Sequence, residues 1–134
     1  EKEGAVEVGG AFTRGVDVSL GGNPDLVMPV ALAAAMSGEE TAIRDVEHLR
    51  HKESDRISTV LDVLQRTGVS AWYRNGALHI RGPPSRRNVV FSSHGDHRIG
   101  LMALAAAKVV GGCLDDVAPI AKSWPTALLY FRNS

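Results

Sequence analysis

The chain has 134 residues, of which 44% are hydrophobic, as is typical of one globular domain or a compact part of a larger one. Its 15 basic and 15 acidic side chains balance to a formal net charge of zero, and only 5% of the residues are aromatic. The overall charge therefore gives no support for nucleic acid or a membrane as the main partner, and the few aromatic residues argue against a base-stacking surface.

Cys113 is the only cysteine, which excludes a disulfide within the chain and fits a reducing, cytoplasmic compartment. We expect it to be a small buried residue at the start of a strand. No apolar run is long and uncharged enough to span a bilayer, and no signal peptide is recognisable. Because the first residue is Glu1 rather than methionine, we expect a piece of a longer protein.

The first part of the sequence predicts strands and helices in alternation. Apolar residues between glycines predict strands at 5–8 and 16–20, and another strand is expected at 41–46. The stretch 25–36 is almost wholly apolar and predicts a helix that is buried on most sides. Pro29 is compatible with this helix because it falls in the first turn.

An amphipathic helix should follow the most highly charged stretch of the chain. Its apolar side chains recur at helical spacing, which places them on one face; they are Ile57, Val60, Leu61 and Leu64. Ser54 or Asp55 is the expected N-cap of this helix. Thr67-Gly68 should close it, because glycine is favoured just past the last turn of a helix.

A hairpin and a second series of elements should come next. Arg74-Asn75-Gly76 lies between predicted strands at 69–73 and 77–81, and Asn-Gly accommodates the positive φ angles of a tight turn. The stretch 82–87 should be a surface connection. The remaining predicted elements are a strand at 88–91, a helix at 99–110, a strand at 114–117 and a last helix that starts at 122–125. The whole pattern is that of an α/β fold in which helices cover sheets.

Part of this pattern occurs twice. The sequence Ala31-Leu32-Ala33-Ala34-Ala35 recurs at 103–107, with Asp25 upstream of the first copy and Asp96 upstream of the second. The landmarks that follow are Asp45-Val46 and Lys52 in the first copy, and Asp116-Val117 and Lys122 in the second. Repeated units stack in order to bury faces that they cannot bury alone. We therefore expect two similar units, each with its lysine at the head of a helix.

The stretch from Leu49 to Arg56 places several ionisable side chains directly before the amphipathic helix. Lys52, Glu53 and Arg56 lie at or just before a helix N-terminus, where free N–H groups and the helix dipole favour anions. Two cations at such a position invite a phosphate or carboxylate ligand. The alternative is a solvated, charged helix start that binds nothing.

The run His94-Gly95-Asp96-His97-Arg98 has the composition of half a metal site. However, Ser92 stands where a further histidine would complete the pattern of binuclear metallohydrolases, and the other histidines show no ligand spacing. We therefore expect no bound metal. Asp96 and His97 should instead order a turn from which Arg98 reaches an anion, because a guanidinium group matches carboxylate and phosphate in two-point contacts.

Each of two further candidate site residues, considered alone, could also have a role without any function in binding or catalysis. Asp25 precedes the buried helix, so it could serve only as a helix cap. Lys122 could be an ordinary surface lysine.

Four motifs occur in an order and spacing that match one known family. They are Pro24-Asp25 before the Ala-rich helix, Leu49-Arg50-His51-Lys52-Glu53-Ser54-Asp55-Arg56, Asp96-His97-Arg98-Ile99, and Lys122-Ser123-Trp124-Pro125. Together they resemble the signatures of the EPSP synthases, or 3-phosphoshikimate 1-carboxyvinyltransferases. The resemblance covers nearly the whole chain, from about Gly15 to Phe131.

The resemblance implies a reaction of the shikimate pathway of aromatic amino acid biosynthesis that needs no cofactor. The enolpyruvyl group of phosphoenolpyruvate passes to the 5-hydroxyl of shikimate 3-phosphate, and inorganic phosphate is released. It also implies the enolpyruvyl transferase fold, an inside-out α/β barrel in which six βαβαββ units form two domains that close on the substrates. The units at about 1–82 and 88–134 would belong to the C-terminal domain. The N-terminal domain is absent from this chain, which we expect to be inactive alone.

The resemblance also implies roles for individual residues. Asp25 matches the carboxylate next to the reacting hydroxyl, the proton acceptor, and Glu53 matches the proton donor to the enolpyruvyl carbon. Lys52 matches a lysine that binds shikimate 3-phosphate. The residues that match groups holding phosphoenolpyruvate are Arg56, Arg98 and Lys122. Convergent cations suit substrates that together carry two phosphates and two carboxylates.

This sequence also departs from the family pattern. His48 stands where an asparagine often contacts the shikimate phosphate, and Gly100 stands where alanine is common, which indicates local repacking. Two alternatives remain. One is an enolpyruvyl transferase that acts on UDP-N-acetylglucosamine, although that relative lacks the Lys52–Arg56 motif. The other is a non-catalytic anion-binding or assembly module of the same fold.

Overall fold

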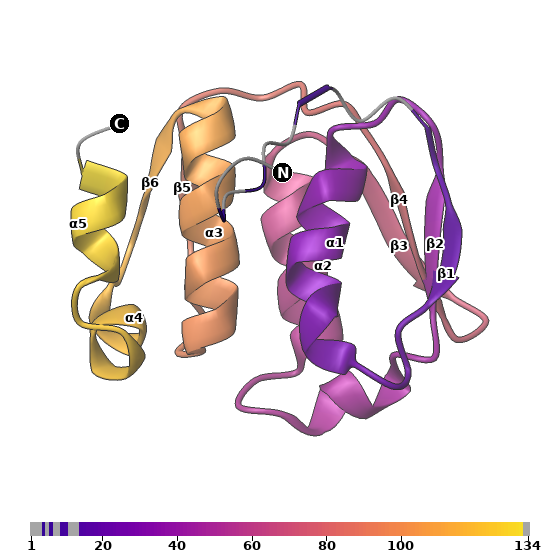
Figure 1. The fold of residues 1–134 in the computed structure, drawn as a ribbon, viewed down its shortest axis with the longest axis horizontal. Coiled ribbons are helices and arrows are strands. Elements are labelled where there is room, and N and C mark those ends of the chain that lie inside the picture. The colour runs from indigo at the N-terminus through magenta and orange to yellow at the C-terminus, as the bar shows by residue number, and fades with distance from the viewer. Residues whose placement is uncertain (1–3, 5, 7–8, 11–13, 133–134) are drawn as a thin grey trace.

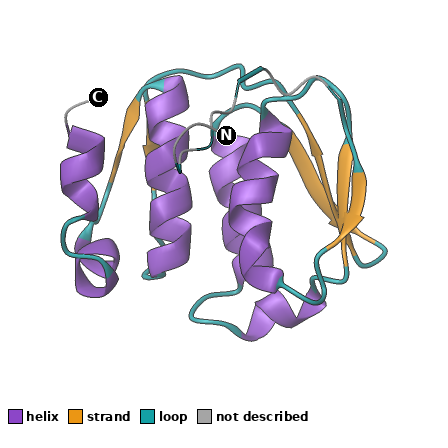
Figure 2. Ribbon diagram, in the orientation of Figure 1, coloured by secondary structure: helices purple, strands orange, loops and turns teal. Residues whose placement is uncertain are grey.

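Three long helices form a layer between two β-sheets in the computed structural model, which describes residue 4, residue 6, residues 9–10 and residues 14–132. Figure 1 shows this arrangement, and in Figure 2 the strands lie on both sides of the helices. The helices are α1 (Val27–Ala35), α2 (Arg56–Arg66) and α3 (His97–Val110). The α/β class predicted from the sequence is confirmed. Of the described helices, none is both long and apolar enough to cross a membrane.

The larger sheet has the strand order β1-β2-β4-β3. β1 pairs in parallel with β2, whereas β2 and β3 both pair antiparallel with β4. Helices α1 and α2 cover one face of this sheet (Figure 1). The strands are β1 (Asp17–Ser19), β2 (Thr41–Arg44), β3 (Ser70–Arg74) and β4 (Ala77–Arg81), as predicted for this part of the chain to within a few residues.

The turn between β3 and β4 has the predicted hairpin geometry. Asn75 has a φ of 52° and Gly76 a φ of 77°, so both residues adopt the left-handed conformation. A two-residue turn of this kind matches the right-handed twist of the flanking strands, and asparagine and glycine tolerate it best. The hairpin is therefore encoded locally.

The amphipathic helix α2 also follows the prediction. Asp55 is its N-cap, since its carboxylate accepts hydrogen bonds from the N–H groups of Ile57 and Ser58. Gly68, with a φ of 87°, follows its last turn. The apolar stripe faces the core: Ile57, Val60 and Leu64 are buried, and Leu61 is partly buried against them.

The smaller sheet contains two parallel strands, β5 (Val89–Phe91) and β6 (Gly112–Leu114). The strand predicted at 114–117 is therefore wrong in position. A Cβ on Gly112 would lie 2.2 Å from the carbonyl oxygen of Val89, so this pairing requires a glycine at the start of β6. The strand ends early because Asp116 turns the chain by accepting a hydrogen bond from the N–H of Ala118.

The prediction that Cys113 is buried is also wrong. Cys113 is exposed, and its register partner Val90 is 54% exposed. Successive side chains of a strand point to opposite faces. Leu114 and Phe91 take the inner face, where Phe91 is 1% exposed, so Cys113 points outward.

Short helices complete the structure. They are η1 (Pro24–Leu26), η2 (Glu47–His51), α4 (Ala118–Ser123) and α5 (Ala127–Arg132). Lys122 lies in the last turn of α4, so the prediction that it heads a helix is wrong. Pro125 disfavours a helical conformation at the preceding residue, and Trp124 accordingly has φ −144° and ψ 82°. The chain thus leaves the helix directly after Lys122 and Ser123.

Gly100 is the point of close contact between α3 and α4. A Cβ at Gly100 would lie 2.9 Å from Cγ1 and 3.2 Å from Cδ1 of Ile120, which is fully buried in α4. Alanine at this position would therefore collide with the side chain that holds α4 against α3. This contact gives a physical reason for the glycine where the family commonly has alanine.

The two series of elements share their first part. The first runs β1-α1-β2-α2-β3-β4, and the second runs β5-α3-β6-α4-α5. Within the described residues, the second series has no strand pair after its last helices. The strand predicted at 5–8 falls largely on residues outside the described ones and remains a prediction.

Candidate functional site

Side chains from three separate motifs meet at the starts of the long helices. Asp25 lies in η1 directly before α1, Arg56 is the first residue of α2, and Asp96 is the N-cap of α3. The turns after β1, β2 and β5 lead into these segments. One end of the helix layer therefore collects residues that are far apart in the sequence.

Asp96 is the buried centre of this group, with an exposed fraction of 0%. Its carboxylate accepts hydrogen bonds from the N–H groups of Arg98 at 3.0 Å and Ile99 at 3.5 Å, which caps α3. It also accepts bonds from Ser54 Oγ at 2.7 Å and from Arg56 Nε at 2.9 Å. The sequence predicted that Asp96 and His97 order a turn before Arg98; the structure shows that Asp96 caps α3 at this point. Its contact with Arg56 was not predicted.

Arg56 is almost completely buried, with 2% of its side chain exposed. Beside its two bonds to Asp96, its Nη2 donates to Glu53 at 2.7 Å. Its Nη1 lies 3.6 Å from a carboxylate oxygen of Asp25. A single guanidinium group thus links both carboxylates that the family resemblance assigns to proton transfer.

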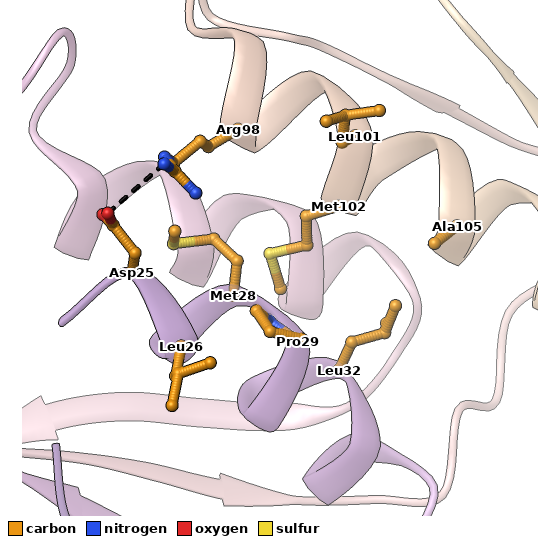
Figure 3. A pocket seen from close by; sticks show the side chains of 9 residues that line it. All are labelled: Asp25, Leu26, Met28, Pro29, Leu32, Arg98, Leu101, Met102 and Ala105. Carbon is orange, nitrogen blue, oxygen red and sulfur yellow. Dashed lines mark ion pairs between the residues drawn. The ribbon is translucent and has the colours of Figure 1, made fainter. Parts of the chain in front are cut away.

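Asp25 and Arg98 form a second ion pair at 3.3 Å, between side chains that are 45% and 43% exposed. Figure 3 shows this pair at one end of a pocket between α1 and α3. The pocket measures about 390 Å³, and apart from Asp25 and Arg98 its lining is apolar: Leu26, Met28, Pro29, Leu32, Leu101, Met102 and Ala105. The charged ends of the two helices are therefore accessible beside an apolar surface.

Burial and ion pairing have opposite effects on the pKa values of Asp96 and Arg56. Burial favours the uncharged form of Asp96, but the hydrogen bonds from Arg56 and Ser54 outweigh it and lower the pKa of Asp96. Burial likewise opposes the charge of Arg56, but its bonds to Asp96 raise its pKa further above the usual range. Both groups are thus charged at neutral pH.

The connected group carries an excess of negative charge. Its carboxylates are those of Asp25, Glu53 and Asp96, and its cations are Arg56 and Arg98, which leaves one net negative charge. An anionic ligand that approaches Arg98 must therefore compete with Asp25 at Nη2 and meets repulsion from its carboxylate. Additional cations would have to come from neighbouring exposed side chains.

The other predicted site residues are not joined to this group by direct contacts. His48, Lys52 and Lys122 are exposed, and their side chains form no hydrogen bond or ion pair with the described residues. His48 lies in η2 and Lys52 just after it, so both lie near the start of α2 in the sequence. Lys122 lies in α4, which packs against α3.

The sequence-based candidates for a metal site have other partners. His94 Nε2 lies 2.8 Å from a carboxylate oxygen of Asp62, and Asp96 is surrounded by donors and by Arg56. In the described part of the chain, no group of three or more His, Cys, Asp or Glu side chains is placed to hold a metal ion.

Comparison of the sequence with known proteins shows the family of this chain. The family model of EPSP synthase (3-phosphoshikimate 1-carboxyvinyltransferase) matches residues 1–128. The chain belongs to the EPSP synthase family. The 3-phosphoshikimate 1-carboxyvinyltransferase of Syntrophobacter fumaroxidans is 38% identical over 128 residues, which are 94% of this chain. The protein of the same name from Aeropyrum pernix is 46% identical over 92 residues, or 69% of this chain.

The structural comparison agrees with the sequence relationship. A solved structure of EPSP synthase from Acinetobacter baumannii superposes with a TM-score of 0.64 and 27% identity, and the match covers 77% of this chain. The enolpyruvyl transferase fold expected from the motifs is confirmed. This chain covers only 30% of the length of the Syntrophobacter relative and 25% of the Acinetobacter chain. It therefore corresponds to a part of the proteins that it matches.

Proposed function

We propose that this chain is a C-terminal part of an EPSP synthase, which transfers the enolpyruvyl group of phosphoenolpyruvate to the 5-hydroxyl of shikimate 3-phosphate. The observation that carries the proposal is the ion-pair group in which Arg56 links Asp25, Glu53 and Asp96. It joins side chains from three of the four family motifs. A structural helix cap alone would not require the two further carboxylates, which are 45% and 55% exposed.

In this proposal, Glu53 and Asp25 carry out the two proton transfers. In the reacting complex Glu53 must be in its protonated form, and it gives this proton to the methylene carbon of phosphoenolpyruvate. The neighbouring carbon becomes cationic and bonds to the 5-oxygen, while Asp25 accepts the hydroxyl proton. Glu53, now a carboxylate, takes back a proton from the new methyl group as inorganic phosphate departs with the electrons of its C–O bond. This step restores the double bond, and Asp25 returns its proton to solvent. The carboxylates near this centre stabilise its transient positive charge.

The cations have binding roles. Arg98, which is half-exposed beside the pocket, is suited to hold phosphoenolpyruvate once Asp25 releases it. We assign Lys122 to the same ligand, and Lys52 and His48 to shikimate 3-phosphate. The resemblance implies that Arg56 also holds phosphoenolpyruvate. Because its side chain is only 2% exposed and bonds to Asp96 and Glu53, we propose instead that it contributes by the electrostatic field of its buried charge and by holding Glu53.

We further propose that the two units, at about 1–82 and 88–134, form part of the C-terminal domain, and that the remaining domain of the same enzyme supplies the opposite wall of the site. The share of its relatives that the chain covers supports this view. The exposed free thiol of Cys113 supports a reducing, cytoplasmic location for the whole enzyme.

The test is phosphate release from shikimate 3-phosphate and phosphoenolpyruvate. We expect no turnover by the isolated chain, because one open wall cannot exclude water or align both reactants. The full-length enzyme, or this chain mixed with the complementary fragment, should release phosphate. Turnover by the isolated chain at the rate of a full-length enzyme would contradict the fragment assignment. The absence of phosphate release by the full-length protein would support the non-catalytic alternative.

A further inference from the structure

The segment 51–54 runs from the last residue of η2 to the residue before the N-cap of α2, and it carries two of the proposed site residues. Lys52 follows η2 in an extended conformation, with φ −101° and ψ −164°. Glu53 comes next, and α2 begins at Arg56 after its N-cap Asp55. The position of Glu53 therefore depends on how the two ends of the segment 51–54 are fixed.

One side chain connects both ends of this segment. Arg50 Nε donates to a carboxylate oxygen of Glu47 at 2.9 Å, within η2. Its Nη1 donates to Asp55 at 3.1 Å, on the far side of the segment. Asp55 at the same time accepts the N–H groups of Ile57 and Ser58, so Arg50 is tied to the start of α2.

The same guanidinium group is also held by the large sheet. It lies 5.0 Å from the ring centroid of Tyr73, a residue of β3. The Tyr73 hydroxyl donates a hydrogen bond to Glu47, the other partner of Arg50. Arg50 is thus fixed by η2, by the N-cap of α2 and by an aromatic ring of the sheet at once.

Each of these contacts is weak alone, because the side chains are partly exposed and their charges are screened. Their combination is specific, because only a planar group with several separate donors can meet two carboxylates and an aromatic face together. Lysine has one cationic nitrogen and can satisfy only part of this set. The arrangement therefore identifies arginine as the residue that this position needs.

We propose that Arg50 is a positioning residue that holds the segment 51–54 so that Glu53 and Lys52 lie in register with Asp25 and Arg98. Arg50 itself does not touch the reacting atoms. It acts through Asp55 and Tyr73, which fix the ends of the segment against α2 and β3. The catalytic consequence rests on the proposed function, but the structural consequence does not.

The first test measures opening of the segment in the full-length protein. We compare the wild type with Arg50→Met, Arg50→Lys and the control Arg74→Met, and follow cleavage after Glu53 by a glutamate-specific protease with mass spectrometry. Arg74 is an exposed neighbour in β3 whose side chain forms no hydrogen bond or ion pair with another described residue. Cleavage after Glu40, in the turn between α1 and β2, reports general loosening of the fold.

We expect Arg50→Met to accelerate cleavage after Glu53 by about tenfold, since cleavage follows the population of the open segment. Arg50→Lys should give an intermediate rate and Arg74→Met the wild-type rate. Cleavage after Glu40 should not change. Unchanged cleavage after Glu53 in Arg50→Met, or an equal rise after Glu40, would overturn the proposal.

The second test separates chemistry from binding. Arg50→Met should lower kcat by about tenfold with a smaller rise in KM, because misplacing a proton donor slows the chemical step. Arg50→Lys should restore part of the loss. Normal kcat in a variant whose segment opens readily would also overturn the proposal. If the wild-type protein released no phosphate, the proposed function would fail, whereas the cleavage rates would still decide whether Arg50 holds the segment.

Discussion

Arg56 Nε and a carboxylate oxygen of Asp96 lie 2.9 Å apart, although the residues are 40 positions apart in the sequence. One residue begins α2 in the first series of elements, and the other caps α3 in the second. Both are removed from water, with exposed fractions of 2% and 0%. This pair therefore connects the two units and fixes the starts of two helices at the same time.

Breaking this pair should destabilise the fold. Arg56→Ala leaves the carboxylate of Asp96 buried without its cation, and removing one partner of a buried pair typically costs about 3–5 kcal/mol. We expect a loss of that order in the free energy of unfolding, measured by urea denaturation of this chain. Arg44→Ala, which removes an exposed pair with Asp17, is the matched control and should change the stability far less. Similar losses in both variants would show that burial of Arg56 has no energetic importance.

The same pair should make stability depend on pH at the acid end. Because hydrogen bonds from Arg56 and Ser54 lower the pKa of Asp96 below its ordinary value of 3.8, the unfolded chain takes up a proton before the folded one does. The contribution of Asp96 is complete above the unfolded pKa and is lost as the pH falls towards the folded pKa. Urea titrations between pH 7 and pH 3 should show this loss, and Asp96→Asn should flatten the curve. Parallel curves for both proteins would contradict this reading.

Proton transfer by Glu53 can be tested in the full-length enzyme. Glu53→Gln preserves the shape of the side chain and its bond from Arg56 but removes the acidic proton, so kcat should fall by about 10² or more with little change in KM. Asp25→Ala should lower kcat in the same way. Steady-state phosphate release provides both constants. Near-normal turnover of Glu53→Gln would exclude Glu53 as the proton donor.

Replacing Asp25 and replacing Arg98, the two partners of one ion pair, should change anion binding in opposite directions. Asp25→Asn removes a negative charge and frees Arg98, so phosphoenolpyruvate should bind about three- to tenfold more tightly at low salt even though turnover falls. Arg98→Ala should weaken binding. Equilibrium binding at two salt concentrations measures both changes. Asp17→Asn changes the net charge equally but on β1, and it should leave the affinity unaltered.

Features encoded by neighbouring residues could be predicted from the sequence. The stripe of α2, its cap Asp55 and the hairpin at Asn75-Gly76 each depend on short-range spacing and on backbone preferences. The misplaced start of β6 has a long-range cause. Gly112 begins β6 because it approaches Val89 in another strand, and no local pattern reveals that contact.

The candidate site also has features that the sequence predicted and features that it did not. The motifs supplied Asp25, Glu53, Arg56 and Arg98, and the structure brings these four together. They could not show that Arg56 is buried against Asp96, because that contact depends on how the two units pack. The helix head expected at Lys122 failed for a local reason, the proline at position 125, which ends α4 at this point.

The missing side chain at Gly100 determines where Lys122 lies. Gly100 is two residues beyond Arg98 in α3, and Ile120, two residues before Lys122, occupies the space that a methyl group at position 100 would fill. A methyl group there would have to displace the Ile120 side chain or move α4, and a shift of α4 would carry Lys122 with it. The spacing between two proposed phosphoenolpyruvate ligands is thus set by a residue that touches neither substrate. A Gly100→Ala variant of this chain would therefore need a smaller or displaced side chain at position 120 to keep the same cation spacing.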